Sequence, residues 1–216
     1  MAQLFRRRAT TLFRAGIFVA VLAVLALAYV GYAVPRTDLY WSVGVPAPQP
    51  VPLSHDHHVG GLGIGCRYCH SSVERAAFAG MPSGDTCMSC HSQIWTAAAV
   101  LAPVQRSLEL GEPVVWSSVH RLPDFTYFHH GIHVSKGVGC ETCHGRVDLM
   151  PRTVKTETLS MGWCLDCHRD PGPYLRPRDA IYAMGWEATP DEEIPDLIEH
   201  YGIVVGQLTD CSVCHR

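Results

Sequence analysis

Positive charge is scarce in most of this chain. Of its 17 basic residues only Lys136 and Lys155 are lysines, and four of the arginines lie before residue 15. Beyond residue 34 the chain carries 13 basic residues against 20 acidic ones. Proteins that bind nucleic acid need a basic patch or stripe, so this composition excludes nucleic acid as a partner.

The sequence also lacks an unpaired cysteine. Its ten cysteines form five C-x-x-C pairs, and a histidine follows each pair at once. The five motifs are Cys66, Cys69 and His70; Cys87, Cys90 and His91; Cys140, Cys143 and His144; Cys164, Cys167 and His168; and Cys211, Cys214 and His215. C-x-x-C-H is the attachment signature of c-type haem, in which two thiols add to one porphyrin and the histidine is the proximal iron ligand. The sequence therefore predicts five covalently bound haem c groups.

Zinc and disulfide bonds explain the pattern less well. Structural zinc sites combine two C-x-x-C units into one four-thiolate cage, which needs no histidine after each unit, and five units cannot all pair. Disulfide bonds form outside the cytoplasm, but they too leave the five histidines unexplained.

Residues 53–91 and 128–168 form an internal repeat. In each copy an H-x-x-H segment precedes G-x-G-C and two haem motifs, and a shift of 75 residues relates the two segments. Each H-x-x-H supplies distal ligands to two different haems, so the predicted distal ligands are His55, His58, His130 and His133. The glycines before the cysteine are expected to let the backbone approach the porphyrin closely.

The fifth haem, at residues 211–215, has two candidate distal ligands. His120 is the first, and Met161, three residues before Cys164, is the thioether alternative. A methionine ligand raises the potential of a haem above that of a bis-histidine haem. A structural role is an equal alternative for both residues. The other histidines outside the motifs, His57, His129 and His200, are interpreted as surface or hydrogen-bonded residues.

Residues 15–34 form an uncharged apolar run of 20 residues. A helix of that length spans about 30 Å, the thickness of a bilayer core. The positive-inside rule places residues 1–14, which hold four arginines, in the cytoplasm and the rest of the chain in the periplasm. A cleaved signal peptide with an A-x-A site at residues 26–28 is the alternative. The apolar run continues past that site, which favours a retained single-pass anchor in the cytoplasmic membrane.

The expected fold is a multihaem cytochrome c, mostly irregular, with short α-helices around the haems and one N-terminal transmembrane helix. Residues 35–52 are a Pro-rich spacer, and residues 53–216 are the periplasmic pentahaem domain. Within that domain we expect a helix over 94–110 that stops at Gly111, an extended segment over 113–128 and a helix around 191–200. The acidic stretch 179–210 is either a docking site for a basic partner or a solvated surface.

Longer segments carry a resemblance to known families. H-x-x-H before paired C-x-x-C-H units resembles the small class III multihaem cytochromes. The N-terminal helix, the five motifs and two segments resemble the pentahaem cytochrome c subunit of alternative complex III over nearly the whole chain. Those segments are residues 120–130, HRLPDFTYFHH, and residues 161–169, MGWCLDCHR. The related hexahaem subunit of quinone reductase complexes has an extra haem motif that this chain lacks.

The resemblance implies an electron-carrier subunit that is no enzyme on its own. Its partners would be iron–sulfur and polytopic quinol-binding subunits, and its acceptor a periplasmic cytochrome c, a copper protein or an oxidase. A cytochrome subunit of another quinone-linked respiratory complex is one alternative, including a single-anchor quinol dehydrogenase. A multihaem reductase is another, but eight histidines outside the motifs and the absence of C-x-x-C-K give no sign of an open iron site.

Overall fold

The computed structural model describes residues 6–215. The chain divides into two compact units between Ser42 and Val43. Each unit is described by itself below.

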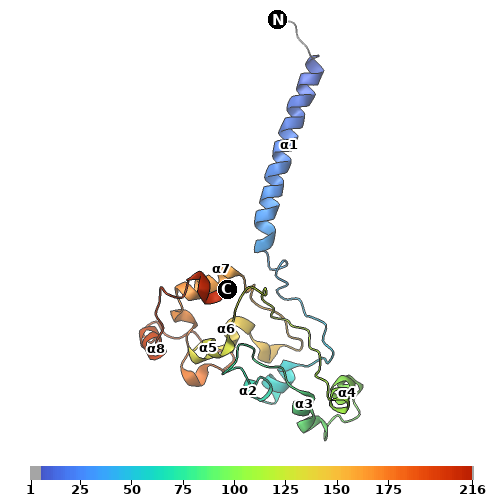
Figure 1. The fold of residues 1–216 in the computed structure, drawn as a ribbon, viewed down its shortest axis with the longest axis vertical. Helices are drawn as coiled ribbons and strands as arrows, with labels where there is room; N and C mark the ends of the chain where they lie inside the picture. Colours follow the sequence, from blue (N-terminus) through green and yellow to red (C-terminus); the bar gives the residue numbers. More distant parts are fainter. Residues whose placement is uncertain (1–5, 216) are drawn as a thin grey trace. The chain divides into compact units, whose positions relative to one another are not determined.

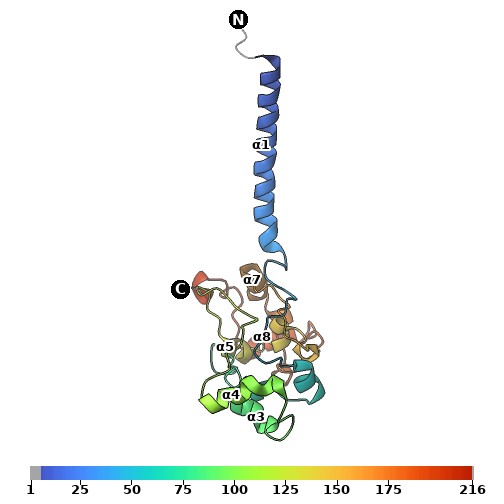
Figure 2. The ribbon, with the colours of Figure 1, turned by 90° about the vertical axis from the view of Figure 1, so that its right-hand side faces the viewer.

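The first unit consists mainly of helix α1, Arg7–Ala33, which continues into a 3-10 turn, η1, Val34–Arg36. None of the residues of α1 or η1 is buried, although an 18-residue window within Arg7–Arg36 has a mean hydropathy of 2.5 (Figure 2). The helix is therefore long and apolar enough to cross a membrane, and it begins eight residues earlier than the predicted span 15–34. Signal sequences near an N-terminus share these features. Residues 1–5 of the predicted cytoplasmic segment 1–14 lie outside the described residues.

The second unit is built from short helices joined by irregular chain (Figure 1). Five of the helices hold the five C-x-x-C pairs: α2 Cys66–Cys69, α3 Gly84–His91, α6 Cys140–His144, α7 Met161–Arg169 and α9 Cys211–Cys214. The others are α4 Ala102–Leu110, α5 His130–Ser135 and α8 Ile194–His200, with a π-helical turn, η2, Asp56–Gly61. Four further 3-10 turns are η3 Ala99–Leu101, η4 Val147–Leu149, η5 Gly172–Tyr174 and η6 Arg178–Ala180. Within residues 6–215 the backbone makes isolated β-bridges and no strand.

These elements confirm the expectation of short helices around the motifs and differ from it in one helix. The predicted helix over 94–110 begins only at Ala102, because Pro103 occupies its first turn and Trp95 has a positive φ of 56°. Proline favours the first turn of a helix, so Pro103 is the sequence signal that marks this start. Gly111 ends the helix with a φ of 67°, as predicted. Residues 113–128 contain no helix, and α8 lies inside the predicted range 191–200.

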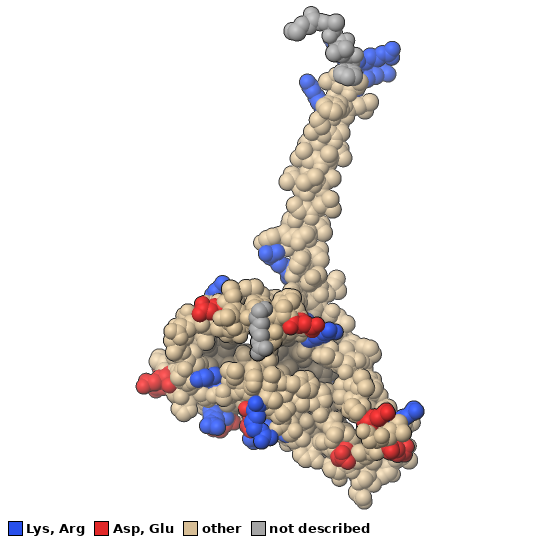
Figure 3. All heavy atoms as spheres, in the orientation of Figure 1, with Lys and Arg blue, Asp and Glu red and all other residues tan. Residues whose placement is uncertain are grey.

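The apolar core made by the protein's own side chains is small. Among the described residues, Leu175 and Val104 are the largest side chains that are fully buried. The chain exposes 14932 Å², whereas a compact protein of its mass of 23.8 kDa exposes about 9,900 Å². Helix α1 accounts for part of the excess, and the surface of the second unit is visibly hollowed (Figure 3). The second unit therefore has room among its short helices for large planar groups.

Candidate haem sites

Each attachment motif lies on a helical turn, and in motifs 1, 3 and 5 this turn makes up the whole helix and begins abruptly. Gly65, Gly139 and Asp210 precede their cysteines in extended conformation, with ψ of 143°, 149° and 135°. In the turn that follows, the two cysteines stand three residues apart and therefore share one face of the helix. The motif thus presents both thiols to the same side, as attachment to one porphyrin requires.

The histidines use one ring nitrogen for a hydrogen bond and leave the other available. Eight of the ten candidate ligand histidines have an oxygen partner at Nδ1. The partners are Thr153 Oγ1 for His55 (2.9 Å), Ser54 O for His58 (2.8 Å), Gly80 O for His70 (2.7 Å), Ile94 O for His91 (3.3 Å), Ala77 O for His130 (2.7 Å), His129 O for His133 (2.9 Å), Leu208 O for His168 (2.8 Å) and Phe125 O for His215 (3.2 Å). Seven of these partners are carbonyls, which can only accept, so in those seven histidines Nδ1 carries the proton and Nε2 keeps its lone pair. The hydroxyl of Thr153 can donate to or accept from His55. Metal-ligating histidines usually show this arrangement.

Three distal candidates lie opposite motif histidines at nearly equal distances. The ring centroids are 6.2 Å apart for His58 and His91, 6.3 Å for His130 and His144, and 6.2 Å for His133 and His168. Two imidazoles on opposite sides of one metal ion, each with a metal–nitrogen bond of about 2 Å, have centroids about 6 Å apart. The three pairs therefore fit bis-histidine haem iron.

The remaining H-x-x-H histidine, His55, belongs to a buried group of imidazoles. Its pKa is lowered by burial first and then by the nearby rings of His70 and His58. The pKa of His144 is lowered to about 3 by burial and by His120, His130, His70 and His55. The lowered pKa values favour the neutral form of His55 and His144, and neutral imidazole is the form that binds a metal.

His120 lies beside motif 3, at residues 140–144. Its ring centroid is 4.2 Å from that of His144, and its Nε2 is buried with no hydrogen-bond partner. Burial lowers the pKa of His120 to about 4. An unpartnered buried nitrogen suits a metal ligand, but the ring lies next to motif 3, whereas the sequence assigned it to the fifth haem.

Met161 begins helix α7 with its side chain 62% exposed. It stands one turn before Cys164 and shares that helix face. Cys164 lies near Cys214 of motif 5, and the pKa of its thiol is raised by burial and by that neighbouring thiol. At motif 5 the ring neighbour of His215 is Phe125, with centroids 5.8 Å apart. Met161 is thus a candidate that fits the fifth site.

Motif 3 is surrounded by a charged network that the sequence analysis did not anticipate. Glu141, inside the C-x-x-C turn, accepts hydrogen bonds from the backbone of Gly185 (2.8 Å) and Trp186 (3.2 Å). It also lies 3.6 Å from the guanidinium of Arg176, which is buried, and 3.8 Å from that of Arg146. The partners lie up to 45 residues away, so no local spacing could have indicated them.

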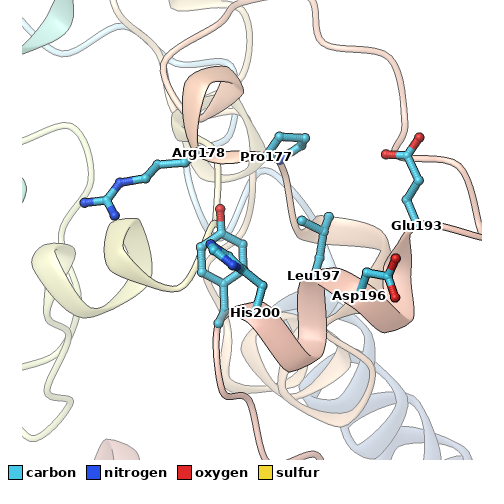
Figure 4. A pocket seen from close by; sticks show the side chains of 7 residues that line it. Pro177, Arg178, Glu193, Asp196, Leu197 and His200 are labelled. Carbon is cyan, nitrogen blue, oxygen red and sulfur yellow. The ribbon is translucent and has the colours of Figure 1, made fainter.

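Two cavities border the second unit. One, of about 300 Å³, is lined by Gly63, Gly65 and Cys66 of the first motif together with Asp148 and Tyr182. The other, of about 570 Å³, lies on α8 between Arg178, Glu193, Asp196 and His200 (Figure 4). The first cavity includes an attachment thiol, whereas no motif residue lines the second.

Five attachment turns and paired imidazoles with free Nε2 atoms define the arrangement of a multihaem cytochrome c. No family model matches the chain. A search of curated proteins finds the multiheme cytochrome c subunit of menaquinone reductase from Nitratidesulfovibrio vulgaris (strain Hildenborough), with 36% identity over 97 residues. The match covers 44% of this chain and 45% of that protein, so it spans less than half of either. The similarity to a multihaem cytochrome c agrees with the five attachment turns and the paired imidazoles.

Proposed function

We propose that this chain is the pentahaem electron-transfer subunit of a membrane-bound quinol:electron-acceptor oxidoreductase of the alternative complex III type. The observation that carries the proposal is the set of imidazole pairs 6.2–6.3 Å apart, each joining an H-x-x-H histidine to a motif histidine. Haem c bound at these sites supplies a one-electron couple. The protein's part is to fix the order, spacing and axial ligands of five such groups.

The proposed ligand set follows from the hydrogen bonds and ring distances. The ten motif cysteines hold the porphyrins, and the five motif histidines are the proximal ligands. His55, His58, His130 and His133 are the distal ligands opposite His70, His91, His144 and His168 in turn. Met161 is the distal candidate for the fifth haem, because it stands one turn before Cys164, which lies near Cys214 of motif 5. His120 is the alternative.

The proposed setting is the cytoplasmic membrane. Residues 15–34 anchor the chain with residues 1–14 inside, residues 35–52 form the spacer, and residues 53–216 carry the haems in the periplasm. Iron–sulfur and polytopic quinol-binding subunits deliver electrons, and a periplasmic cytochrome c, copper protein or oxidase receives them. The chain itself carries electrons and catalyses no reaction alone.

The similarity to a menaquinone reductase subunit favours a second candidate, a cytochrome subunit of another quinone-linked complex. Both candidates share the electron-transfer role and differ in their partner subunits. Purification from membranes followed by subunit identification separates them, because the proposal expects iron–sulfur and polytopic quinol-binding subunits of the alternative complex III type.

The haem count is the direct test of the site. Pyridine haemochrome analysis should give about five haems per chain, and the denatured protein should keep its haem on a reducing gel, because thioether bonds are covalent. A stoichiometry of two or fewer contradicts the proposal.

The location of catalysis is a separate test. The purified chain should show no quinol oxidation of its own, and activity should return when the other subunits are present. Robust quinol oxidation by the chain alone would place the catalytic site in this protein and refute the carrier role.

A further inference from the structure

The two copies of the repeat hold one another's distal histidines. In copy 1, the backbone N–H groups of His55 and Asp56 both donate to Met150 O at 3.1 Å, and Thr153 lies at His55 Nδ1. Met150 and Thr153 follow motif 3, which is the first haem motif of copy 2. The first H-x-x-H is thus fixed by the segment that follows the other copy's first motif.

The same exchange occurs in the opposite direction. In copy 2, the N–H of Gly131 donates to Ala76 O at 3.1 Å. The N–H of His130 and its Nδ1 both contact Ala77 O, at 3.3 and 2.7 Å. Ala76 and Ala77 follow motif 1, which is the first haem motif of copy 1.

The exchanged positions are equivalent in the repeat. Asp56 and Gly131 differ by the repeat shift of 75 residues, and their acceptors Met150 and Ala76 both stand six residues after a motif histidine. In a contact with two-fold symmetry, a site on the first copy meets a second site on the other copy, and the reverse contact uses the same two sites. The two repeat copies meet this condition.

An axis of this kind brings the first motifs of the two copies together. The thiols of Cys66 in motif 1 and Cys140 in motif 3 are neighbours. His130, which contacts Ala77 O just after motif 1, has its ring centroid 6.3 Å from that of His144 in motif 3. Motif 2 contacts motif 1 through Tyr68 OH and Ser89 Oγ, which are 2.6 Å apart. Motif 4 stands next to motif 3, since its two thiols are neighbours of Cys143.

Motif 5 continues the series beyond motif 4. His168 Nδ1 of motif 4 donates to Leu208 O, just before motif 5, at 2.8 Å. Figures 1 and 2 show helix α3, which holds motif 2, and the C-terminal end of the chain at opposite ends of the second unit. In Figure 1, α2 and α6 lie between α3 and α7.

We infer that the five haems, numbered by their motifs, follow one another in space as 2-1-3-4-5, with haems 1 and 3 adjacent at an approximate two-fold axis. The inference rests on the proposed haem ligation. An electron that crosses the whole series enters or leaves at haem 2 on α3 and at haem 5 on α9, and haem 1, first in the sequence, is an internal carrier.

Two matched double variants test the order in the purified full chain. Each of His55→Ala, His58→Ala, His130→Ala and His133→Ala should turn one low-spin haem high-spin. Magnetic dipolar interaction falls steeply with distance. We expect the high-spin EPR signal of H55A/H130A, which marks haems 1 and 3, to be broadened relative to the sum of its single variants. The signal of H58A/H133A, which marks haems 2 and 4 with two haems between them, should equal the sum.

The outcomes separate the order from the proposed function. If the haems followed the sequence order, each double variant would mark haems with one haem between them, so equal behaviour of the two doubles overturns the inference. Single variants without any high-spin signal refute the ligation itself. Iron positions in a cryo-EM map of the wild-type complex test the order without any variant. There, the iron bound by His144 should have the irons of His70 and His168 as nearest neighbours, and an iron bound by His91 between those of His70 and His144 overturns the order.

Discussion

The two copies of the repeat present their second histidine in the same way on different backbones. His58 and His133 each bind, through Nδ1, the carbonyl four residues earlier, and each lies 6.2 Å from its motif histidine. Yet the chain around His58 is the π-helical turn η2, whereas His133 lies in the α-helix α5. The ligand geometry therefore depends on the spacing and the carbonyl at i−4 more than on the type of helix.

The copies differ in what covers the glycines before their first cysteine. Gly63 and Gly65 have open space where a Cβ would stand. A Cβ on Gly137 would overlap the ring of Tyr201, and one on Gly139 would overlap the guanidinium end of Arg176. Copy 2 is closed by the C-terminal segment, to which copy 1 has no equivalent. At Gly137 and Gly139 the close approach therefore involves Tyr201 and Arg176, whereas the sequence analysis expected the porphyrin.

The largest expected effect of this difference is at Gly137. Its φ of 82° costs an alanine about 1–2 kcal/mol, and overlap with the buried Tyr201 ring adds about 1–3 kcal/mol. Gly63 has a φ of 67° and no protein atom within 4 Å of an added Cβ, so protein contacts add nothing to the backbone cost of Gly63→Ala. Thermal unfolding of the purified holoprotein, followed by circular dichroism of the haem band, measures the two losses.

The result also bears on the role of Gly63. Gly137→Ala should lower the unfolding midpoint further than Gly63→Ala, by about 2–4 °C for each kcal/mol of difference. Equal losses would indicate that a porphyrin fills the space beside Gly63, which is the role the sequence analysis gave this glycine.

A smaller effect is expected at Gly139, where the backbone is unstrained. Gly139 and Gly65 have φ of −73° and −67°, so the two alanine variants differ only in their surroundings. Gly139→Ala must displace Arg176 from Glu141 and from Ala183 O, which accepts its hydrogen bond at 2.9 Å. We expect a loss of about 1–3 kcal/mol in the free energy of unfolding, against almost none for Gly65→Ala. Two variants of equal stability would mean that Arg176 moves aside freely.

The local part of this architecture could be predicted from the sequence. C-x-x-C-H and H-x-x-H act within one or two helical turns, so spacing alone indicated five short helices and pairs of ligands. Apolar pattern alone did not predict the start of helix α4. The helix was expected from residue 94, but it begins at Ala102 with Pro103 in its first turn. The stop at Gly111 was predictable, since glycine adopts the left-handed conformation that ends a helix.

The long-range part could not be predicted. The contacts of Asp56 with Met150 and of Gly131 with Ala76 join residues 94 and 55 positions apart. Tyr201 lies 64 positions from Gly137, and three of the four partners of Glu141 lie 35 to 45 positions away. Every residue has a backbone carbonyl, so residue type does not indicate which carbonyl will accept a hydrogen bond from a histidine. The neighbourhood of His120 and His144 likewise arises only when the extended segment 113–128 folds across motif 3.

The smallest expected effect concerns the acidic residues around α8 and the rate of electron transfer to a partner. Exposed acidic residues precede and begin α8, among them Glu192 and Glu193, and the segment from 179 to 215 contains no Lys or Arg. Charge of one sign attracts an oppositely charged partner and speeds encounter, and salt screens it within about 10 Å at 0.1 M. We therefore expect electron transfer from the protein to a basic acceptor, measured by stopped flow, to slow as ionic strength rises.

Two matched double variants show which acidic segment causes this salt dependence. Glu192→Gln with Glu193→Gln should flatten the slope of rate against ionic strength, because it removes two exposed charges from the acidic segment that precedes motif 5 in the sequence. Glu109→Gln with Glu112→Gln removes two exposed charges at α4, which packs against α3 and motif 2, and should leave the slope nearly unchanged. If both pairs change the slope equally, only the net charge matters. If neither does, the acidic segment is a solvated surface, and the acceptor docks elsewhere.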